Sequence, residues 1–396
     1  MKARAKQMFF LGLSGFPLGM AAIQRQKLIS KALISEGWNV VVICSRGTHN
    51  KELNIKKVGR YKGVLYVYLF GPFRNQNFII RNLQKVIAPF MEFALLLRFK
   101  RRRGIHAAIV SNRNSFLASL KYRIVSKVLD FKLIINLVEI YKRRENTNIP
   151  TKINDLLFNN LGVYFYDAVF PISRYIRDSY SLHKKKHHLI PIITDYSYIN
   201  SVSIGHKLDK PFFLFCGSAS YYSSISFVIE AFSLIDIEDC NLILVTNGSS
   251  NEMFLIDDLI TKKHLNNKVI IMKSITDRDL FSLYKSANGL LLPMFDTIQD
   301  QARFPHKLAE YLASGTSVIS NPIGEVGFFL KHLDNALLSE SGNVNRFADN
   351  MKWILNNQTD AKIIGSNGAK LCKLNFDIKI MSKSIDNFLN NLIQSD

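Results

Sequence analysis

Residues 303–320, RFPHKLAEYLASGTSVIS, place positive side chains beside the expected start of a helix. Pro305 suits a first helical position and Gly315 a helix end, so 307–314 is expected to be helical. Backbone N–H groups and the helix dipole favour an anion at such a start. With Arg303 nearby, the chemistry expected here is binding of a phosphate-like group. Taken alone, the segment favours an ordinary strand-loop-helix-strand unit of an α/β domain.

The charge balance of the whole chain also favours a negatively charged partner. Its 396 residues include 52 Lys and Arg against 31 Asp and Glu, a net charge of +21. Such an excess suits nucleic acid, an anionic membrane face or phosphorylated ligands, and does not choose among them. Hydrophobic residues make up 47% and charged residues 21%, which is a globular rather than a disordered composition.

The cysteines indicate a reducing compartment. Cys44, Cys216, Cys240 and Cys372 are scattered without any C-x-x-C spacing. This pattern favours buried thiols and argues against a zinc site or a disulfide framework. We therefore expect a cytoplasmic protein.

The N-terminal residues 1–22, MKARAKQMFFLGLSGFPLGMAA, have the basic head and apolar body of a signal peptide. Gly12, Gly15, Pro17 and Gly19 interrupt the apolar stretch, so export is the minority interpretation. No apolar run approaches the roughly 20 residues that a membrane-spanning helix needs.

Short apolar runs alternate with amphipathic stretches along the chain, which is typical of βαβ units with parallel sheets. Strands are expected at 7–13, 39–45, 64–70, 106–111, 132–138 and 168–173, and again at 211–217, 241–248, 268–274, 289–294 and 316–320. A helix is expected over 19–37. Residues 189–211, with two prolines and many polar residues, interrupt the pattern as a linker.

The sequence therefore predicts an α/β protein with two doubly wound, Rossmann-like domains. We expect an N-terminal domain over 1–200, a C-terminal domain over 201–376 and a closing helix over 377–396. Ligands of such sheets bind beyond the carboxyl ends of the strands. With two domains facing each other, that position is a cleft between them.

The segment 303–326, RFPHKLAEYLASGTSVISNPIGEV, resembles the donor-binding signature of family 4 glycosyltransferases of GT-B fold, of the bacterial cell-envelope polysaccharide type. That signature has the form F-P-x-K-L-x-E-Y-L-A-x-G, followed by a strand and G-E. Further segments are similar to the family in the same order, over most of the chain: 9–47, 166–180, 190–199, 213–218, 227–232, 242–248 and 280–293.

The resemblance implies a retaining transfer of a sugar from a nucleotide-diphosphate sugar, usually without a metal or other cofactor. The leaving diphosphate develops negative charge, so the site needs fixed donors and cations. The backbone N–H groups of His306 and Lys307 and the side chains of Arg303 and Lys307 are expected to supply them. Glu310 matches the carboxylate that binds the ribose hydroxyls in the family. The alternatives are a solvated pair for the two cations and a carboxylate facing the helix dipole for Glu310.

Other positions of the motif are also expected to bind the donor: Phe304, Pro305, His306, Leu308, Ser218, Asn247 and Gly248. Two departures from the family stand out. Ala302 occupies the place of the first of two family glutamates, and residues 217–224, GSASYYSS, offer Ser218 and Ser223 or Ser224 where many members carry Arg and Lys. We expect Arg303 and Lys307 to take over the missing charge.

In the N-terminal domain, the loop SGFPLG would let the backbone approach the diphosphate or the acceptor through Gly15 and Gly19. A tight turn explains these glycines equally well. Glu139 lies where the family keeps a His or Glu beside the reacting sugar and is a candidate catalytic residue; a helix N-terminal carboxylate is the alternative. Arg25 faces the cleft or solvent, and His106, at the start of a strand, is expected to be structural.

Residues 73–104, FRNQNFIIRNLQKVIAPFMEFALLLRFKRRRG, combine apolar side chains with a basic end. Such a helix can lie on an anionic membrane. The alternative is a core helix broken at Pro89 with a solvated end. Together with HKKKHH at 183–188, the segment favours peripheral contact with the inner face of the plasma membrane. No nucleic-acid module is recognisable, so no nucleic-acid partner is expected.

These expectations combine into one function: transfer of a sugar to a lipid-linked or other glycan acceptor in cell-envelope polysaccharide or lipopolysaccharide synthesis. Two alternatives share the same fold. One is a sugar-nucleotide epimerase or hydrolase. The other is a nucleotide-sugar-binding protein with impaired catalysis, which the departures at Ala302 and Ser218 suggest.

Overall fold

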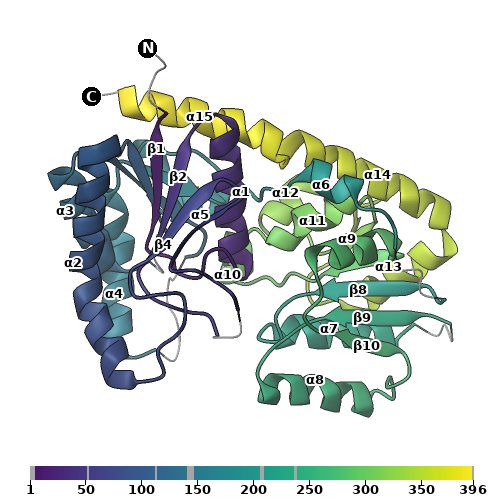
Figure 1. Ribbon diagram of the computed structural model, residues 1–396. Coiled ribbons are helices and arrows are strands. Elements are labelled where there is room, and N and C mark those ends of the chain that lie inside the picture. The colour runs from purple at the N-terminus through teal and green to yellow at the C-terminus, as the bar shows by residue number, and fades with distance from the viewer. Residues whose placement is uncertain are drawn as a thin grey trace. The chain divides into compact units, whose positions relative to one another are not determined.

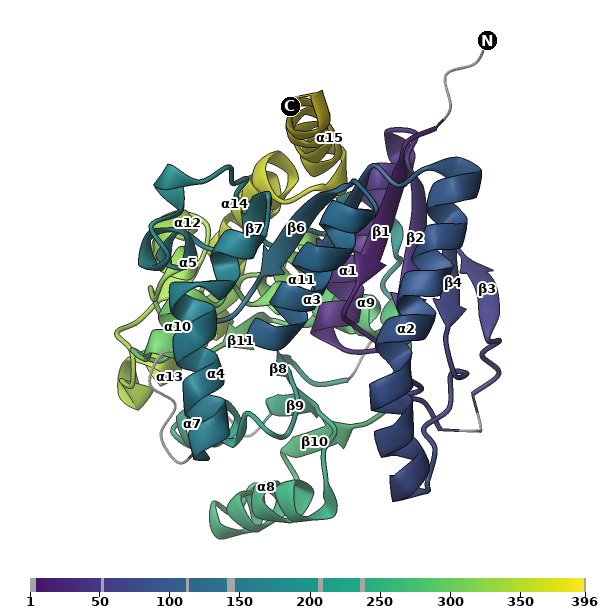
Figure 2. The ribbon, with the colours of Figure 1, turned by 90° about the vertical axis from the view of Figure 1, so that its left-hand side faces the viewer.

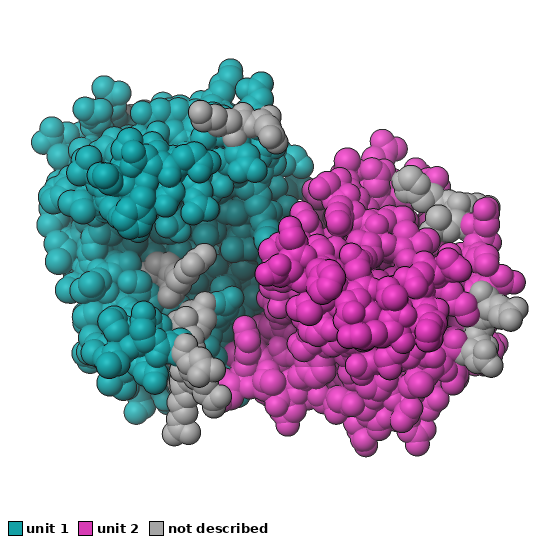
Figure 3. Space-filling model, turned by 90° about the horizontal axis from the view of Figure 1, so that it is seen from below, with its two compact units in different colours: residues 1–193, 378–396 teal, residues 194–377 magenta. Residues whose placement is uncertain are grey.

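The structure, a computed structural model, describes residues 5–50, 53–111, 114–140, 147–205, 209–235 and 239–394 (Figure 1). The chain forms two compact units, which Figure 3 shows in different colours. Unit 1 comprises residues 1–193 and 378–396, and unit 2 comprises residues 194–377. The closing helix α15 (Ile378–Gln394), whose role is not readable from its sequence, thus belongs to unit 1.

Unit 1 is built on a seven-stranded sheet of order β3-β4-β2-β1-β5-β6-β7, in which only β3 runs antiparallel to its neighbour. Its strands are β1 (Gln7–Leu11), β2 (Asn39–Cys44), β3 (Val58–Tyr61), β4 (Val64–Tyr68), β5 (Ala107–Val110), β6 (Lys132–Leu137) and β7 (Ala168–Pro171). The parallel strands are continuous apolar runs because helices cover both of their faces. The six strands expected in this half are confirmed, whereas the edge strand β3 was not predicted.

One face of this sheet is covered by α1 (Ala21–Ser35) and α15, whose Leu33 and Ile385 share a core with Phe10 and Val42. On the other side lie α2 (Phe78–Arg103), α3 (Phe116–Val128) and α4 (Ile149–Asn160), which face the viewer in Figure 2. The short elements of unit 1 are η1 (Gly162–Phe165), α5 (Arg174–Ser179) and η2 (Leu182–Lys184).

Helix α2 contradicts one interpretation of its sequence. It continues without interruption through Pro89, and only Ala88, Glu92 and Leu96 of its residues are buried. The alternative of a core helix broken at the proline is therefore wrong. No helix within the described ranges combines the length and the hydropathy needed to cross a bilayer.

Unit 2 is built on a six-stranded, wholly parallel sheet of order β10-β9-β8-β11-β12-β13. Its strands are β8 (Phe212–Cys216), β9 (Asn241–Val245), β10 (Val269–Met272), β11 (Gly289–Leu292), β12 (Val318–Ser320) and β13 (Leu337–Leu338). Its helices are α6 (Tyr196–Ser201), α7 (Tyr222–Ser233), α8 (Ser250–Lys262), α9 (Asp277–Ser286), α10 (Ile298–Ala302), α11 (His306–Ser314), α12 (Glu325–Phe329), α13 (Val344–Asn356) and α14 (Gln358–Asn375). The five strands expected here are confirmed, and the two-residue strand β13 is additional.

The strand order of unit 2 fixes where a ligand can bind. From β8 the chain winds outward to β9 and β10, and from β11 it winds the other way to β12 and β13. The crevice of a doubly wound sheet lies at such a reversal, beyond the carboxyl ends of the two central strands. In unit 2 that place is next to the loops that follow β8 and β11. The predicted α/β class with two Rossmann-like domains is confirmed.

Candidate functional site

Helix α11 begins in the connection that follows β11, on the side of the reversal in strand order. Pro305 is the residue just before the first turn, with φ −64° and ψ 120°, and Gly315 ends the helix with φ +79°. Leu308, Tyr311 and Leu312 face the core. The N–H groups of a first helical turn have no acceptor within the helix. The helix start therefore offers donors where a ligand of this sheet would bind.

The side chains of this first turn form an ionic cluster. The Nζ of Lys307 lies 2.8 Å from Oε2 of Glu310, and Nε2 of His306 lies 3.2 Å from Oε1 of the same carboxylate. Burial by itself raises the pKa of Glu310, but the charge of Lys307 and the contact with His306 outweigh it and lower that pKa to about 2. Burial likewise works against the charge of Lys307, and the carboxylate raises the pKa of Lys307 above its usual value. Both groups are charged at neutral pH.

Two buried tyrosines and a cysteine support this cluster. The hydroxyl of Tyr284 points at Oε2 of Glu310 from 3.5 Å, and its ring meets that of Tyr311 edge-on at 4.9 Å. The hydroxyl of Tyr311 accepts a hydrogen bond of 2.8 Å from the N–H of Cys216, the last residue of β8. The thiol of Cys216 also lies near Lys307 and helps to raise the pKa of that side chain. These contacts fix α11 against the carboxyl end of the central strand.

Arg303 is held by α10 and by the loop after β8. Its Nε lies 2.7 Å from Oδ1 of the buried Asp300, and its guanidinium stacks over the ring of Tyr221 at 5.0 Å. Asp300 is fixed in turn by the N–H of Phe295, which donates to its Oδ2 over 2.8 Å. Arg303 is thus placed between α11 and the β8 loop. Sequence reasoning missed both Asp300 and Tyr221.

The loops after β8 and β9 lie against each other. The N–H of Ala219 donates to the carbonyl of Asn247 over 3.1 Å, and the hydroxyl of Ser220 donates to that of Ser218 over 2.9 Å. A Cβ on Gly248 would lie 2.5 Å from that of Ala219, so this close approach requires the glycine. The structure therefore brings Ser218, Asn247 and Gly248 to one edge of the sheet.

Some residues of the motif belong to the core instead. Leu308 is buried, and Phe304 stacks on Phe329 with the ring centroids 5.6 Å apart. A donor could reach these two residues only through their backbone. Ala302 is also buried and offers no polar side chain to a sugar hydroxyl.

In unit 1, a hydrogen bond from Tyr68 of β4 holds the glycine loop that follows β1. The hydroxyl of Tyr68 donates to the carbonyl of Phe16 over 2.7 Å and lies 2.9 Å from Nε2 of His49. Gly15 is buried with φ +117°, whereas Gly19 is exposed. The loop follows β1 at the point where the order of this sheet reverses, between β1 and β5.

The remaining candidates of unit 1 have distinct surroundings. Glu139 is exposed, two residues beyond β6, and its carbonyl accepts from Nδ2 of Asn114 over 2.9 Å. His106 accepts from the N–H of Gln7 through Nδ1 over 3.0 Å, which confirms its structural role.

The expectation that Arg25 faces the cleft or solvent is wrong. Its guanidinium is buried and donates to the carbonyls of Ile190 and Pro191 over 2.7 and 2.6 Å and to Oδ1 of Asn136 over 3.1 Å. Burial lowers the pKa of Arg25 to about 9. The side chain holds α1 to the segment that leads out of the sheet.

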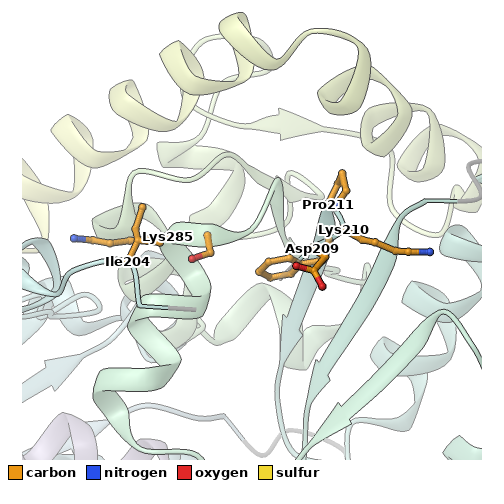
Figure 4. A pocket seen from close by; sticks show the side chains of 7 residues that line it. Ile204, Asp209, Lys210, Pro211 and Lys285 are labelled. Carbon is orange, nitrogen blue, oxygen red and sulfur yellow. The ribbon is translucent and has the colours of Figure 1, made fainter. Parts of the chain in front are cut away.

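A shallow pocket of unit 2 lies elsewhere (Figure 4). Ile204, Asp209, Lys210, Pro211 and Lys285 line it. Pro211 immediately precedes β8, so the pocket lies at the amino end of that strand. It therefore lies at the opposite end of the strands from the start of α11.

Comparison with known proteins adds to this geometry. Residues 199–371, most of unit 2, match the family model described as "Glycosyl transferases group 1". A relative from Methanocaldococcus jannaschii, described as an uncharacterised glycosyltransferase, is 29% identical over 135 residues; the match spans 34% of this chain and only 33% of the relative.

Solved structures match over nearly the whole chain. Sucrose-phosphate synthase from Thermosynechococcus elongatus has a TM-score of 0.78 at 17% identity, over 99% of this chain and 100% of that chain. Anabaena HepE in complex with UDP has a TM-score of 0.70 at 16% identity, over 98% and 100%. The chain has the GT-B fold. In this GT-B chain, α11 and the loops after β8 and β9 all lie within the residues that match the family model.

Proposed function

We propose that this protein is a glycosyltransferase that takes its sugar from a nucleotide-diphosphate donor bound by unit 2. The observation that carries the proposal is the start of α11, beyond the carboxyl ends of the strands, where His306 and Lys307 contact Glu310 in the first turn and Arg303 is held by Asp300 just before it. Cations and fixed N–H groups suit the charge that develops on a leaving diphosphate. The match of residues 199–371 to group 1 glycosyl transferases supports the same chemistry.

The donor is a nucleotide sugar in this proposal because a similarly folded protein was solved with UDP and with UDP-glucose. Glu310 would accept hydrogen bonds from the ribose through the remaining lone pairs of its carboxylate, because His306 already contacts Oε1 and Lys307 contacts Oε2. The loop residues Ser218, Asn247 and Gly248 would line the rest of the donor site. Arg303 and Lys307 would neutralise the negative charge on the leaving group, so we propose a reaction that needs no metal or other cofactor.

We further propose a retaining transfer to a lipid-linked glycan at the cytoplasmic face of a membrane, as in cell-envelope polysaccharide synthesis. Glu139 is the proposed catalytic residue beside the reacting sugar, and the loop of Gly15 and Gly19 would approach the diphosphate or the acceptor. The free thiols of the chain suit a reducing compartment. The basic helix α2 supports a membrane-bound acceptor.

A panel of nucleotide sugars tests the function in two steps: thermal shift for binding, then product formation with membrane extracts. Transfer to an extracted acceptor supports the proposal. Turnover without any acceptor would identify an epimerase or hydrolase, and binding without turnover a binding protein. Either of those results contradicts the proposal.

The role of Arg303 is tested by Arg303→Ala beside Arg278→Ala, an exposed arginine of α9 in the same unit. A charge-assisted bond to a phosphate contributes about 1.5–3 kcal/mol, so Arg303→Ala is expected to weaken donor affinity roughly tenfold to a hundredfold. Arg278→Ala is expected to change it little. A folded Arg303→Ala protein with unaltered donor affinity would rule out this role.

A further inference from the structure

Helix α3 of unit 1 buries polar side chains and exposes apolar ones. The residues it buries are Ser119, Tyr122 and Ser126, two of them serines. The exposed side carries Leu117, Ile124 and Val128, which are 73%, 57% and 63% exposed. A helix that covers a sheet and faces water normally shows the opposite arrangement. The outer side of α3 is therefore suited to contact with an apolar environment.

Helix α2 repeats this pattern. None of its residues 78–87 is buried, although they include Phe78, Ile79, Ile80, Leu83, Val86 and Ile87. Phe90, one turn further, is 74% exposed. The buried Glu92 carboxylate lies 2.7 Å from Nζ of Lys121 and accepts from the hydroxyl of Tyr122 over 3.1 Å. This polar contact with α3 fixes which side of α2 faces outward.

Helix α4 extends the same surface. Its Ile149, Ile153 and Leu156 are exposed, whereas Asp155 is buried. The N–H of Phe116 at the start of α3 donates to Oδ1 of Asn154 over 3.0 Å, so α3 and α4 are joined directly. Figure 2 shows α2, α3 and α4 together on the side of unit 1 that faces the viewer. We name the outward sides of these helices the three-helix face.

The charges of the three-helix face have one sign. The acidic residues of α2, α3 and α4 are Glu92 and Asp155, and both are buried. Every other charged side chain on these helices is Lys or Arg: Arg81, Lys85, Arg98, Lys100, Arg101, Arg102, Arg103, Lys121, Arg123, Lys127 and Lys152. Two copies of such a face would repel each other. An apolar surface bordered by cations instead complements anionic lipid.

We propose that the three-helix face docks on an anionic phospholipid bilayer. Its apolar side chains enter the boundary between headgroups and acyl chains, and its lysines and arginines contact the lipid phosphates. This inference deepens the proposed function, on which it rests for the lipid-linked acceptor. It also involves α3 and α4, beyond the single basic helix that the sequence indicates.

Flotation with lipid vesicles tests the docking. The probes are vesicles of phosphatidylcholine alone and of phosphatidylcholine with phosphatidylglycerol. The protein is expected to float with the anionic vesicles, and salt is expected to weaken the binding. The variant Ile79→Ser/Leu83→Ser/Phe90→Ser is expected to lose at least about tenfold in partitioning, because it removes apolar area from the interface.

A matched control exists on α14 of unit 2, where Ile363 and Leu374 are also exposed. The variant Ile363→Ser/Leu374→Ser is expected to float like the wild type. For the charges, Lys85→Gln/Lys127→Gln is expected to weaken binding to anionic vesicles about thirtyfold. Its control, Lys362→Gln/Lys370→Gln, replaces two exposed lysines of α14 and is expected to have little effect.

Several results would overturn the inference. One is equal loss in the α14 controls, and another is undiminished flotation of the three-helix variants. A third is a wild-type protein that binds neither kind of vesicle and forms a dimer, with the variant Ile79→Ser/Leu83→Ser/Phe90→Ser remaining monomeric. A second copy would then cover the three-helix face. Nucleotide affinity separates this test from the proposed function: the three-helix variants should retain it, and Lys307→Met should retain vesicle binding.

Discussion

Lys307 is expected to contribute both to the stability of unit 2 and to its binding of the donor, and replacing it by Met tests both roles. Glu310 is buried, and its pKa is lowered from 4.5 to about 2, mainly through Lys307. A shift of this size corresponds to roughly 3 kcal/mol of favourable interaction with the charged carboxylate. The side chain of Lys307 is 31% exposed, so solvent screening reduces its share. We expect Lys307→Met to lower the free energy of unfolding of unit 2 by about 2 kcal/mol.

The double variant Lys307→Met/Glu310→Gln distinguishes the two roles. It leaves no unpaired buried charge, so it should regain at least about half of the lost stability. Donor affinity should stay reduced by roughly tenfold to a hundredfold, because the cation that meets the diphosphate is still missing.

The two tryptophans make the assay specific for each unit. Trp38 lies in unit 1 and Trp353 in unit 2, so a Trp38→Phe background leaves a fluorescence signal from unit 2 alone. Urea unfolding in that background gives the stability, and calorimetric titration with UDP and GDP gives the affinity. The exposed Lys362→Met serves as the control. Unchanged unfolding of Lys307→Met, or full nucleotide affinity of the double variant, would refute the reasoning.

Two further predictions concern buried charges. The lowered pKa of Glu310 means that its contribution to stability is fully present above about pH 4.5 and is lost as the pH falls towards 2. Urea midpoints measured from pH 5 to pH 3 should therefore fall more steeply in the wild type than in Glu310→Gln, and parallel slopes would contradict this assignment. In unit 1, Arg25→Met leaves the carbonyls of Ile190 and Pro191 without their donor and should cost about 2–4 kcal/mol. In a Trp353→Phe background, an unshifted urea transition of Trp38 would show that these bonds contribute nothing.

The strands of both sheets were predictable because parallel strands covered on both faces are continuous apolar runs. The same rule explains the omissions. β3 is an edge strand with the sequence VGRY, and β13 has only two residues, so neither forms such a run. The packing of α15 on α1 joins opposite ends of the chain, and no local pattern reveals such a contact.

The site was predictable only where its residues share one short segment. Lys307 and Glu310 stand three positions apart on a helix, which places them on the same side. Cys216, Tyr221 and Tyr284 come from other elements of unit 2, and only the fold brings them to α11 and Arg303. The outward-facing apolar side of α3 was not predictable from its sequence, because that orientation depends on the polar contacts of Glu92, Lys121 and Tyr122.

Hydrogen exchange with and without nucleotide tests the central claim most directly. The probe is whichever of UDP and GDP binds in calorimetry, at a saturating concentration. The account predicts slower exchange of the backbone amides at 216–221, 246–249 and 304–308, which belong to the loops after β8 and β9 and to the start of α11. Saturation that leaves these three segments unchanged, with protection elsewhere in the chain, would contradict it.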